Sequence, residues 1–142
     1  MVVRLGMISV LAAMLGTNAV ARAPVNCTDA ESIRADNTVH TVHDWTSMYH
    51  AFKNYARCDD GAIAEQFSDR VEMLLTNRWP SVREFFDLAA SEPEFEKFIL
   101  NHIDVTTSEK GLSDIAFNAT RRCPHEVQAL CEKIATKAKN PE

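Results

Sequence analysis

The chain has 142 residues, of which 15 are lysine or arginine and 20 are aspartate or glutamate, so its formal net charge is −5. This acidic balance argues against a nucleic-acid partner, because an acidic chain repels the phosphate backbone. It is compatible with a basic protein partner. The length is that of one domain.

Residues 1–23 have the pattern of a cleavable signal peptide. Arg4 precedes an apolar run from Leu5 to Leu15, and Ala21-Arg22-Ala23 fits the A-x-A cleavage pattern. The run is about 11 residues long, whereas a transmembrane helix needs about 20. We therefore expect a soluble periplasmic or extracellular protein with no membrane span in its mature part. Cleavage leaves 13 basic and 20 acidic residues, a net charge of −7.

Residues 24–38 show no apolar periodicity and are expected to form an irregular tail. From residue 39 onward, apolar residues recur at spacings of three and four, which predicts short amphipathic helices. The first is expected over 39–57 and ends at the turn Asp59-Asp60-Gly61, where an aspartate can cap the second helix. The second ends before Trp79-Pro80, because the residue before a proline avoids the helical conformation.

Prolines and capping pairs mark the starts of the remaining helices. These are Pro80, Ser91 with Glu94, Thr106 with Glu109, and Pro124. No segment alternates strictly as a strand does, and residues 139–142 are expected to fray. The sequence thus predicts a single all-α domain over 39–138, an orthogonal bundle of about six short amphipathic helices that is bridged by disulfides.

Four cysteines follow the predicted cleavage site: Cys27, Cys58, Cys123 and Cys131. An even number in an exported chain predicts disulfides. If the last helix begins directly after Cys123, Cys131 lies about 10 Å along its axis, beyond the roughly 7 Å between Cα atoms that a disulfide spans. We therefore expect Cys58 to pair with Cys123 or Cys131. The alternative, Cys27–Cys58 with Cys123–Cys131, requires the last helix to begin near Glu126.

Three histidines are candidates for a functional face. On a wheel of 100° per residue over 39–57, they fall opposite the apolar stripe, with an aspartate close by. The group is His40, His43, Asp44 and His50. A solvated polar surface is the simplest interpretation, and a partner-contact face is the functional alternative. Two histidines three residues apart can share a metal ion, but His50 lies two turns farther on, so no metal is expected.

No catalytic motif stands out. His102 and Asp104 close the predicted fourth helix, but no G-x-S-x-G or similar setting supplies a nucleophile. We expect His102 to stabilise the helix end instead. The turn at Asp59–Gly61 lacks the further oxygen ligands of a calcium loop. No P-loop, dinucleotide fingerprint or H-E-x-x-H motif occurs, so neither a cofactor nor enzymatic activity is expected.

These features predict a small exported helical module that works by binding another protein. In size, compartment and helix content it resembles the periplasmic immunity proteins that bacteria keep against cell-wall amidases delivered by type VI secretion. The resemblance implies an inhibitor of a cell-wall-degrading effector, and it assigns no inhibitory residue because it covers no motif. Two alternatives stay open: a periplasmic carrier of a small ligand or metal that uses the histidine face, and an enzyme of unrecognised type.

Overall fold

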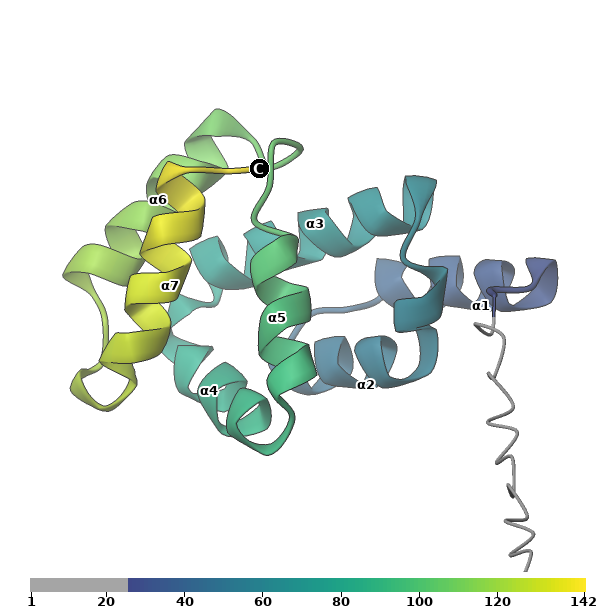
Figure 1. Ribbon diagram of the computed structural model, residues 1–142, viewed down its shortest axis with the longest axis horizontal. Coiled ribbons are helices and arrows are strands. Elements are labelled where there is room, and N and C mark those ends of the chain that lie inside the picture. Colours follow the sequence, from purple (N-terminus) through teal and green to yellow (C-terminus); the bar gives the residue numbers. More distant parts are fainter. Residues whose placement is uncertain (1–25) are drawn as a thin grey trace, which may run out of the picture.

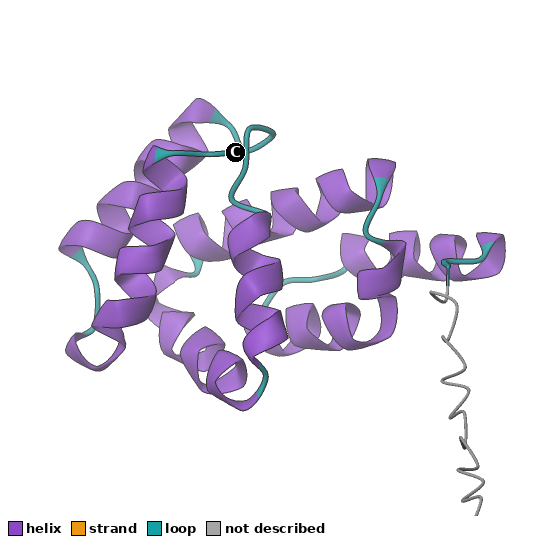
Figure 2. Ribbon diagram, viewed as in Figure 1, coloured by secondary structure: helices purple, strands orange, loops and turns teal. Residues whose placement is uncertain are grey.

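The computed structural model describes residues 26–142, so the predicted signal peptide lies outside the described part (Figures 1 and 2). Residues 26–142 form seven α-helices and three short 3₁₀ segments, with no strand among them. The all-α fold class predicted from the sequence is confirmed. The α-helices are α1 (Asp29–His40), α2 (Trp45–Tyr55), α3 (Gly61–Asn77), α4 (Val82–Ser91), α5 (Pro93–Asn101), α6 (Glu109–Arg121) and α7 (Gln128–Lys139). The 3₁₀ segments are η1 (Ala56–Cys58), η2 (Trp79–Ser81) and η3 (His125–Val127).

The longest helix, α3, contacts α1 toward one end of the molecule and α6 toward the other (Figure 1). Helices α6 and α7 pack side by side as a hairpin, and α4 and α5 form a second pair of sequence neighbours in contact. Contacts of α2 with α4 and α5, and of α5 with α7, close the bundle. None of the helices within 26–142 has both the length and the apolar character needed to cross a membrane.

A continuous series of aromatic rings fills the core. Trp45 of α2 stacks on Phe85 of α4 with ring centroids 4.7 Å apart, and Phe85 meets Phe95 of α5 edge-on at 5.7 Å. The series continues through Phe52, Phe98, Phe67 and His102. Each such pair adds roughly 0.5–1.5 kcal/mol beyond the burial of its area. The rings therefore join α2, α3, α4 and α5 into one unit.

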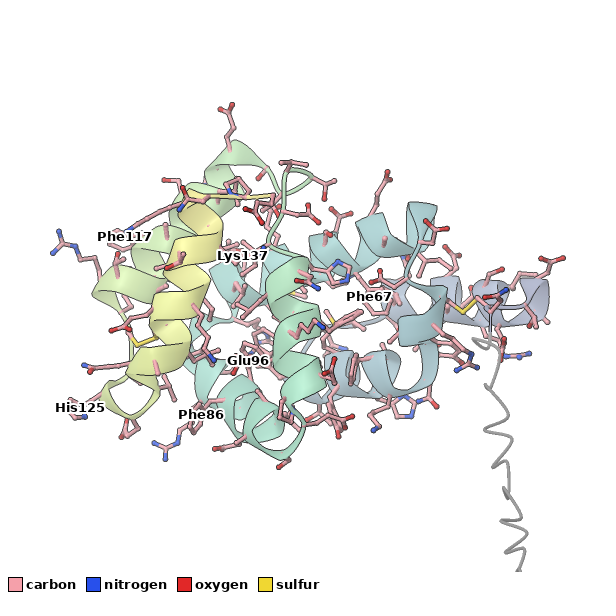
Figure 3. The ribbon with its side chains drawn as sticks, viewed as in Figure 1. Phe67, Phe86, Glu96, Phe117, His125 and Lys137 are labelled. Atoms are coloured by element: carbon pink, nitrogen blue, oxygen red, sulfur yellow. A yellow bond between two sulfur atoms is a disulfide. The ribbon has the colours of Figure 1, made fainter. Side chains whose placement is uncertain are left out.

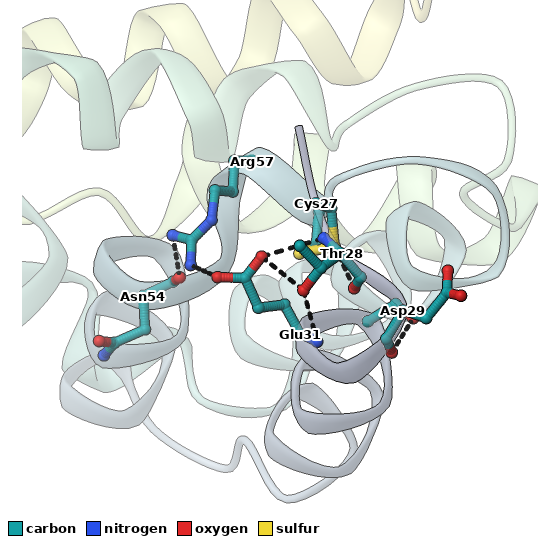
Figure 4. Close-up of a disulfide and its surroundings, with 8 residues drawn as sticks. Cys27, Thr28, Asp29, Glu31, Asn54 and Arg57 are labelled. Atoms are coloured by element: carbon teal, nitrogen blue, oxygen red, sulfur yellow. Dashed lines mark hydrogen bonds and ion pairs between the residues drawn. A yellow bond between two sulfur atoms is a disulfide. The ribbon is translucent and has the colours of Figure 1, made fainter. Parts of the chain in front are cut away.

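The segment expected to be an irregular tail contains helix α1 from Asp29 onward. Thr28 caps this helix, because its hydroxyl accepts from the Glu31 N–H at 3.3 Å while the Glu31 carboxylate accepts from the Thr28 N–H at 3.0 Å (Figure 4). The Arg57 guanidinium of η1 pairs with the same carboxylate. Only Ala35 and Val39 of α1 are buried, so the helix has no apolar period for sequence reasoning to detect.

The single helix expected over 39–57 is interrupted between α1 and α2. Asp44 caps α2, since its carboxylate accepts from the Ser47 N–H at 2.7 Å and the Ser47 hydroxyl accepts from the Asp44 N–H at 3.2 Å. Hydrogen bonds from Ser47 hold the pKa of Asp44 below its ordinary value. Trp45 follows immediately and is fully buried. The interruption lets α2 leave the direction of α1 while its first residue enters the core.

The disulfide pairing expected for Cys58 was wrong. The structure joins Cys27 to Cys58 and Cys123 to Cys131, with Cα atoms 4.9 and 6.1 Å apart. This is the alternative pairing considered above. The chain turns back through η3 after Cys123, and α7 begins only at Gln128. Cys131 therefore lies in the first turn of α7, close enough to Cys123 for a bond.

Two predicted helix starts are also displaced. Helix α5 begins at Pro93 after Glu92, whose carboxylate accepts hydrogen bonds from Tyr49 and Lys53 of α2 rather than capping the helix. Lys53, and then Tyr49, lower the pKa of Glu92. Ser108, not Thr106, caps α6. The predicted aspartate cap of α3 is confirmed, with Asp60 accepting from the N–H of the next residue at 2.8 Å.

A glycine sets the close approach of α6 to α3. A Cβ atom at Gly111 would overlap the carboxylate of Glu72 on α3. That carboxylate accepts hydrogen bonds from the N–H and hydroxyl of Ser108 at 3.1 and 2.7 Å. Because Gly111 leaves this space free, the first turn of α6 is fixed directly to α3.

The capping carboxylate of Glu31 predicts an acid-dependent stability. Hydrogen bonds from Arg57 and Thr28 lower the pKa of Glu31 to about 2 from an ordinary value of 4.5. Because the folded-state pKa is depressed, this stabilisation is present above about pH 4.5 and is lost as the pH falls toward about 2. We expect Glu31→Gln to lower the thermal midpoint at neutral pH and to weaken its fall in acid, as measured by circular dichroism across this range.

The control for this experiment is Glu132→Gln, which removes an exposed carboxylate of α7 and should keep the wild-type acid dependence. A Glu31→Gln protein whose midpoint fell with pH as steeply as the wild type would refute the role given to the cap.

Removing the two disulfides should cost different amounts of stability. Cys27–Cys58 joins residues 31 apart, whereas Cys123–Cys131 joins residues 8 apart. In the chain-entropy model the longer loop contributes about 4 kcal/mol and the shorter one about 2.5 kcal/mol. We expect the paired alanine variant of Cys27–Cys58 to unfold at the lower urea concentration. A larger loss for the Cys123–Cys131 variant would contradict this ranking.

Candidate functional site

The histidines predicted to share one helical face belong to separate elements. His40 ends α1, His43 lies in the connection, and His50 is on α2. All three are exposed. The His43 ring lies 3.0 Å from the Thr41 carbonyl oxygen through Nδ1 and 3.4 Å from Asp44 Oδ2 through Nε2. Because the helix is interrupted here, the wheel that grouped them no longer applies. No three His, Cys, Asp or Glu side chains within 26–142 are placed to hold a metal ion.

A buried polar cluster surrounds His102, just after α5. Its Nδ1 lies 3.0 Å from the Ser68 hydroxyl of α3, and its Nε2 lies 3.2 Å from Asp59 Oδ2, without the alignment of a hydrogen bond. The Ser68 hydroxyl is also placed to donate to Asp104 at 3.4 Å. Sequence reasoning singled out His102 and Asp104, considered Asp59 only as part of the turn before α3, and missed Ser68 of α3.

The cluster contains the side-chain types of a serine–histidine–aspartate triad, but its serine and histidine are buried. Ser68 and His102 are only 4% and 5% exposed. The rings of Phe67 and Phe98 lie 5.6 and 4.5 Å from the imidazole. This enclosure favours a structural role over nucleophilic attack, which requires contact between the hydroxyl and a substrate. The arrangement pairs Ser68 with His102 where α3 packs against the connection after α5, whereas His102 Nε2 and Asp59 Oδ1 make no hydrogen bond.

One surface depression lies beside the start of α2, and a second lies between the end of α3 and α6. The first, of about 380 Å³, is lined by Asp44, Asn77, Arg78, Pro80, Ser81 and Glu84. The second, of about 260 Å³, is lined by Thr76, Asn77, Asp114, Phe117, Asn118 and Arg122. Asn77 lines both depressions, and we refer to the two together as the band, which runs from the cap of α2 past the end of α3 to α6. Of the predicted partner residues, Asp44 lines this band, and the His43 carbonyl accepts from Arg78 Nε at 3.4 Å.

Two larger depressions lie elsewhere, and their charged groups are largely engaged. One, of about 630 Å³, lies between α5 and the end of α7, where Lys133 pairs with Glu96 and Lys137 lies 3.9 Å from Glu142. Figure 3 labels Glu96 and Lys137 on these two helices. The other, of about 620 Å³, lies beside the Cys27–Cys58 disulfide, where Arg57 is bound to the capping carboxylate of α1.

Phe117 is the exposed aromatic residue of the band. Its side chain lies on α6 at the opposite end of the molecule from α1 (Figure 3) and is 52% exposed. The Arg122 guanidinium lies 5.4 Å from the centre of its ring, a cation–π contact. Arg121 is one turn after Phe117 on the same side of the helix. Among the residues described, no carboxylate lies within ion-pair distance of Arg121 or Arg122. We call Phe117, Arg121 and Arg122 the α6 face.

The backbone beneath the α6 face is held in place. The buried Asn118 amide donates to the Leu75 carbonyl oxygen at 3.0 Å. The Trp79 indole N–H donates to the Arg122 carbonyl oxygen at 2.9 Å. These bonds attach the last turns of α6 to the end of α3 and to η2. A preordered surface of this kind loses less conformational entropy when it binds.

Replacing His102 tests the structural role of its cluster. His102→Ala opens a space between Phe67 and Phe98 and leaves the buried Ser68 hydroxyl without its imidazole partner. We expect a loss of about 2–4 kcal/mol of unfolding free energy in urea. The control is His125→Ala, an exposed residue of η3 whose replacement should change stability by less than about 0.5 kcal/mol. Equal stability of the two variants would show that the cluster does not support the fold.

The chain was compared with known proteins. No protein-family model, no curated protein and no solved structure matches it.

Proposed function

We propose that this protein is a binding module that docks on another protein through the α6 face. The observation that carries the proposal is Phe117, an aromatic ring left half-exposed under a guanidinium on a backbone fixed by two hydrogen bonds. Aromatic residues and arginine are enriched among the few contact residues that supply most of the energy of protein interfaces. Asp44 lines the far end of the same band, where the His43 carbonyl oxygen accepts from Arg78, and both extend the proposed contact surface.

The proposed setting is the periplasm or the extracellular space. Two disulfides support it, since such bonds persist in oxidising compartments. Within this setting we propose a cell-wall-degrading effector as the partner and inhibition of that effector as the outcome. The support is the likeness to immunity proteins in size, compartment and helix content. The net negative charge favours a basic partner for the chain as a whole.

A carrier of a small ligand is the second candidate. The depression between α5 and α7 has a volume of about 630 Å³, within the range of about 300–1,000 Å³ that is usual for small-molecule sites. It opens widely to solvent along α7, whereas a carried ligand is normally enclosed over most of its surface. Protein docking at the α6 face is therefore the favoured function.

Affinity capture with matched variants tests the docking proposal. The wild-type protein, Phe117→Ala and Val105→Ala serve as baits in an extract of the compartment from which the protein is purified. Val105 is 72% exposed and lies outside the band, so its variant is the control for lost apolar surface. We expect a partner that the wild type and Val105→Ala retain and that Phe117→Ala loses by about 30-fold, the effect of a strong contact residue.

Equal retention by all three baits would show that the α6 face is not the docking surface. The enzyme alternative is checked with the same purified protein. Turnover of peptidoglycan by the purified wild-type protein would replace the binding proposal.

A further inference from the structure

The charge of the α6 face is opposite to that of the chain as a whole. Asp114, the acidic residue of its depression, pairs with Lys110 one turn earlier on α6. Arg121 and Arg122 have no such partner within the described residues. Arg78 lines the neighbouring depression together with Asp44 and Glu84, so the excess of positive charge is confined to Arg121 and Arg122. The surface around Phe117 is therefore a positively charged patch on an acidic protein.

We propose that the α6 face binds an acidic segment of its protein partner, with an apolar side chain packed on Phe117 and carboxylates placed on Arg121 and Arg122. This inference rests on the proposed docking function and names the chemistry of the partner. A guanidinium can bind a carboxylate through two parallel hydrogen bonds, which gives orientation as well as energy. The local charge, rather than the net charge of the chain, then selects the segment that docks here.

A long polyanion is a poorer fit to the same patch. Charges act over about 8 Å at physiological ionic strength, so a short acidic segment lying on the α6 face is affected mainly by the nearby arginines. A nucleic acid extending beyond the patch meets the rest of an acidic surface and is repelled. The phenyl ring also offers an apolar contact that a side chain of a peptide can cover.

Chemical-shift mapping with short probes tests the partner chemistry. The ¹⁵N-labelled protein is titrated with a peptide that has one central Phe among Asp and Glu residues, with a peptide of the same length that has Lys in their place, and with a thymidine oligonucleotide. We expect the acidic peptide to shift the amides of residues 114–122. Its dissociation constant should rise at least about threefold between about 50 and 200 mM salt, since the contact is electrostatic.

Charge reversal provides the second measurement. Arg121→Glu with Arg122→Glu should weaken the acidic peptide at least about tenfold, whereas Lys97→Glu should not. Lys97 is 70% exposed on α5, away from the patch. An unchanged thermal midpoint confirms that the charge-reversed protein is folded. Equal shifts from the lysine peptide or the oligonucleotide, or acidic-peptide shifts that fall outside 114–122, would overturn the inference.

The outcomes separate the two proposals. If capture depends on Phe117 but the acidic peptide causes no shift, docking stands and the acidic partner is refuted. If the acidic peptide binds residues 114–122 but Phe117→Ala captures as well as the wild type, the docking function is refuted.

Discussion

The series of aromatic rings from Trp45 to His102 is the constraint on which the rest of the structure depends. It joins α2, α3, α4 and α5 through successive ring contacts. An isolated helix shorter than about 12–15 residues is marginally stable in water. Most of these four helices are shorter than that. Their stability therefore comes from burial in this shared core. Trp79 links the core to α6, because its indole N–H donates to the Arg122 carbonyl oxygen at the end of that helix.

The apolar spacing in the sequence was sufficient to predict most helices and insufficient to find their ends. Helix α1 was missed because a capping box and a disulfide stabilise it, and neither of these produces a periodic spacing of apolar residues in the sequence. The break before α2 was missed because Val39, Val42 and Trp45 continue a helical spacing across it. A sequence signal was present, since Asp44 and Ser47 form a reciprocal cap in which serine stands where glutamate is usual.

The candidate site was less predictable than the fold. Ser68 and His102 meet only because α4 and α5 return the chain to α3, so no local spacing indicates their contact. The disulfide of Cys131 depends on η3, a 3₁₀ turn that delays the start of α7. Phe117 did carry a usable signal. It is a large apolar residue beside the buried stripe of Ile115 and Ala119 rather than within it. When that stripe faces the core, a residue beside it is left exposed to solvent.

The hairpin of α6 and α7 is closed by contacts between residues near one another in the chain, and its disulfide spans only 8 residues. Local contacts of this kind form quickly because little chain entropy is lost in closing them. Helix α1, by contrast, reaches its place against α3 through a longer loop. An opening confined to α1 would lie at the end of the molecule remote from α6 (Figure 1). The α6 face thus lies on a hairpin whose own closure does not depend on contacts with α1.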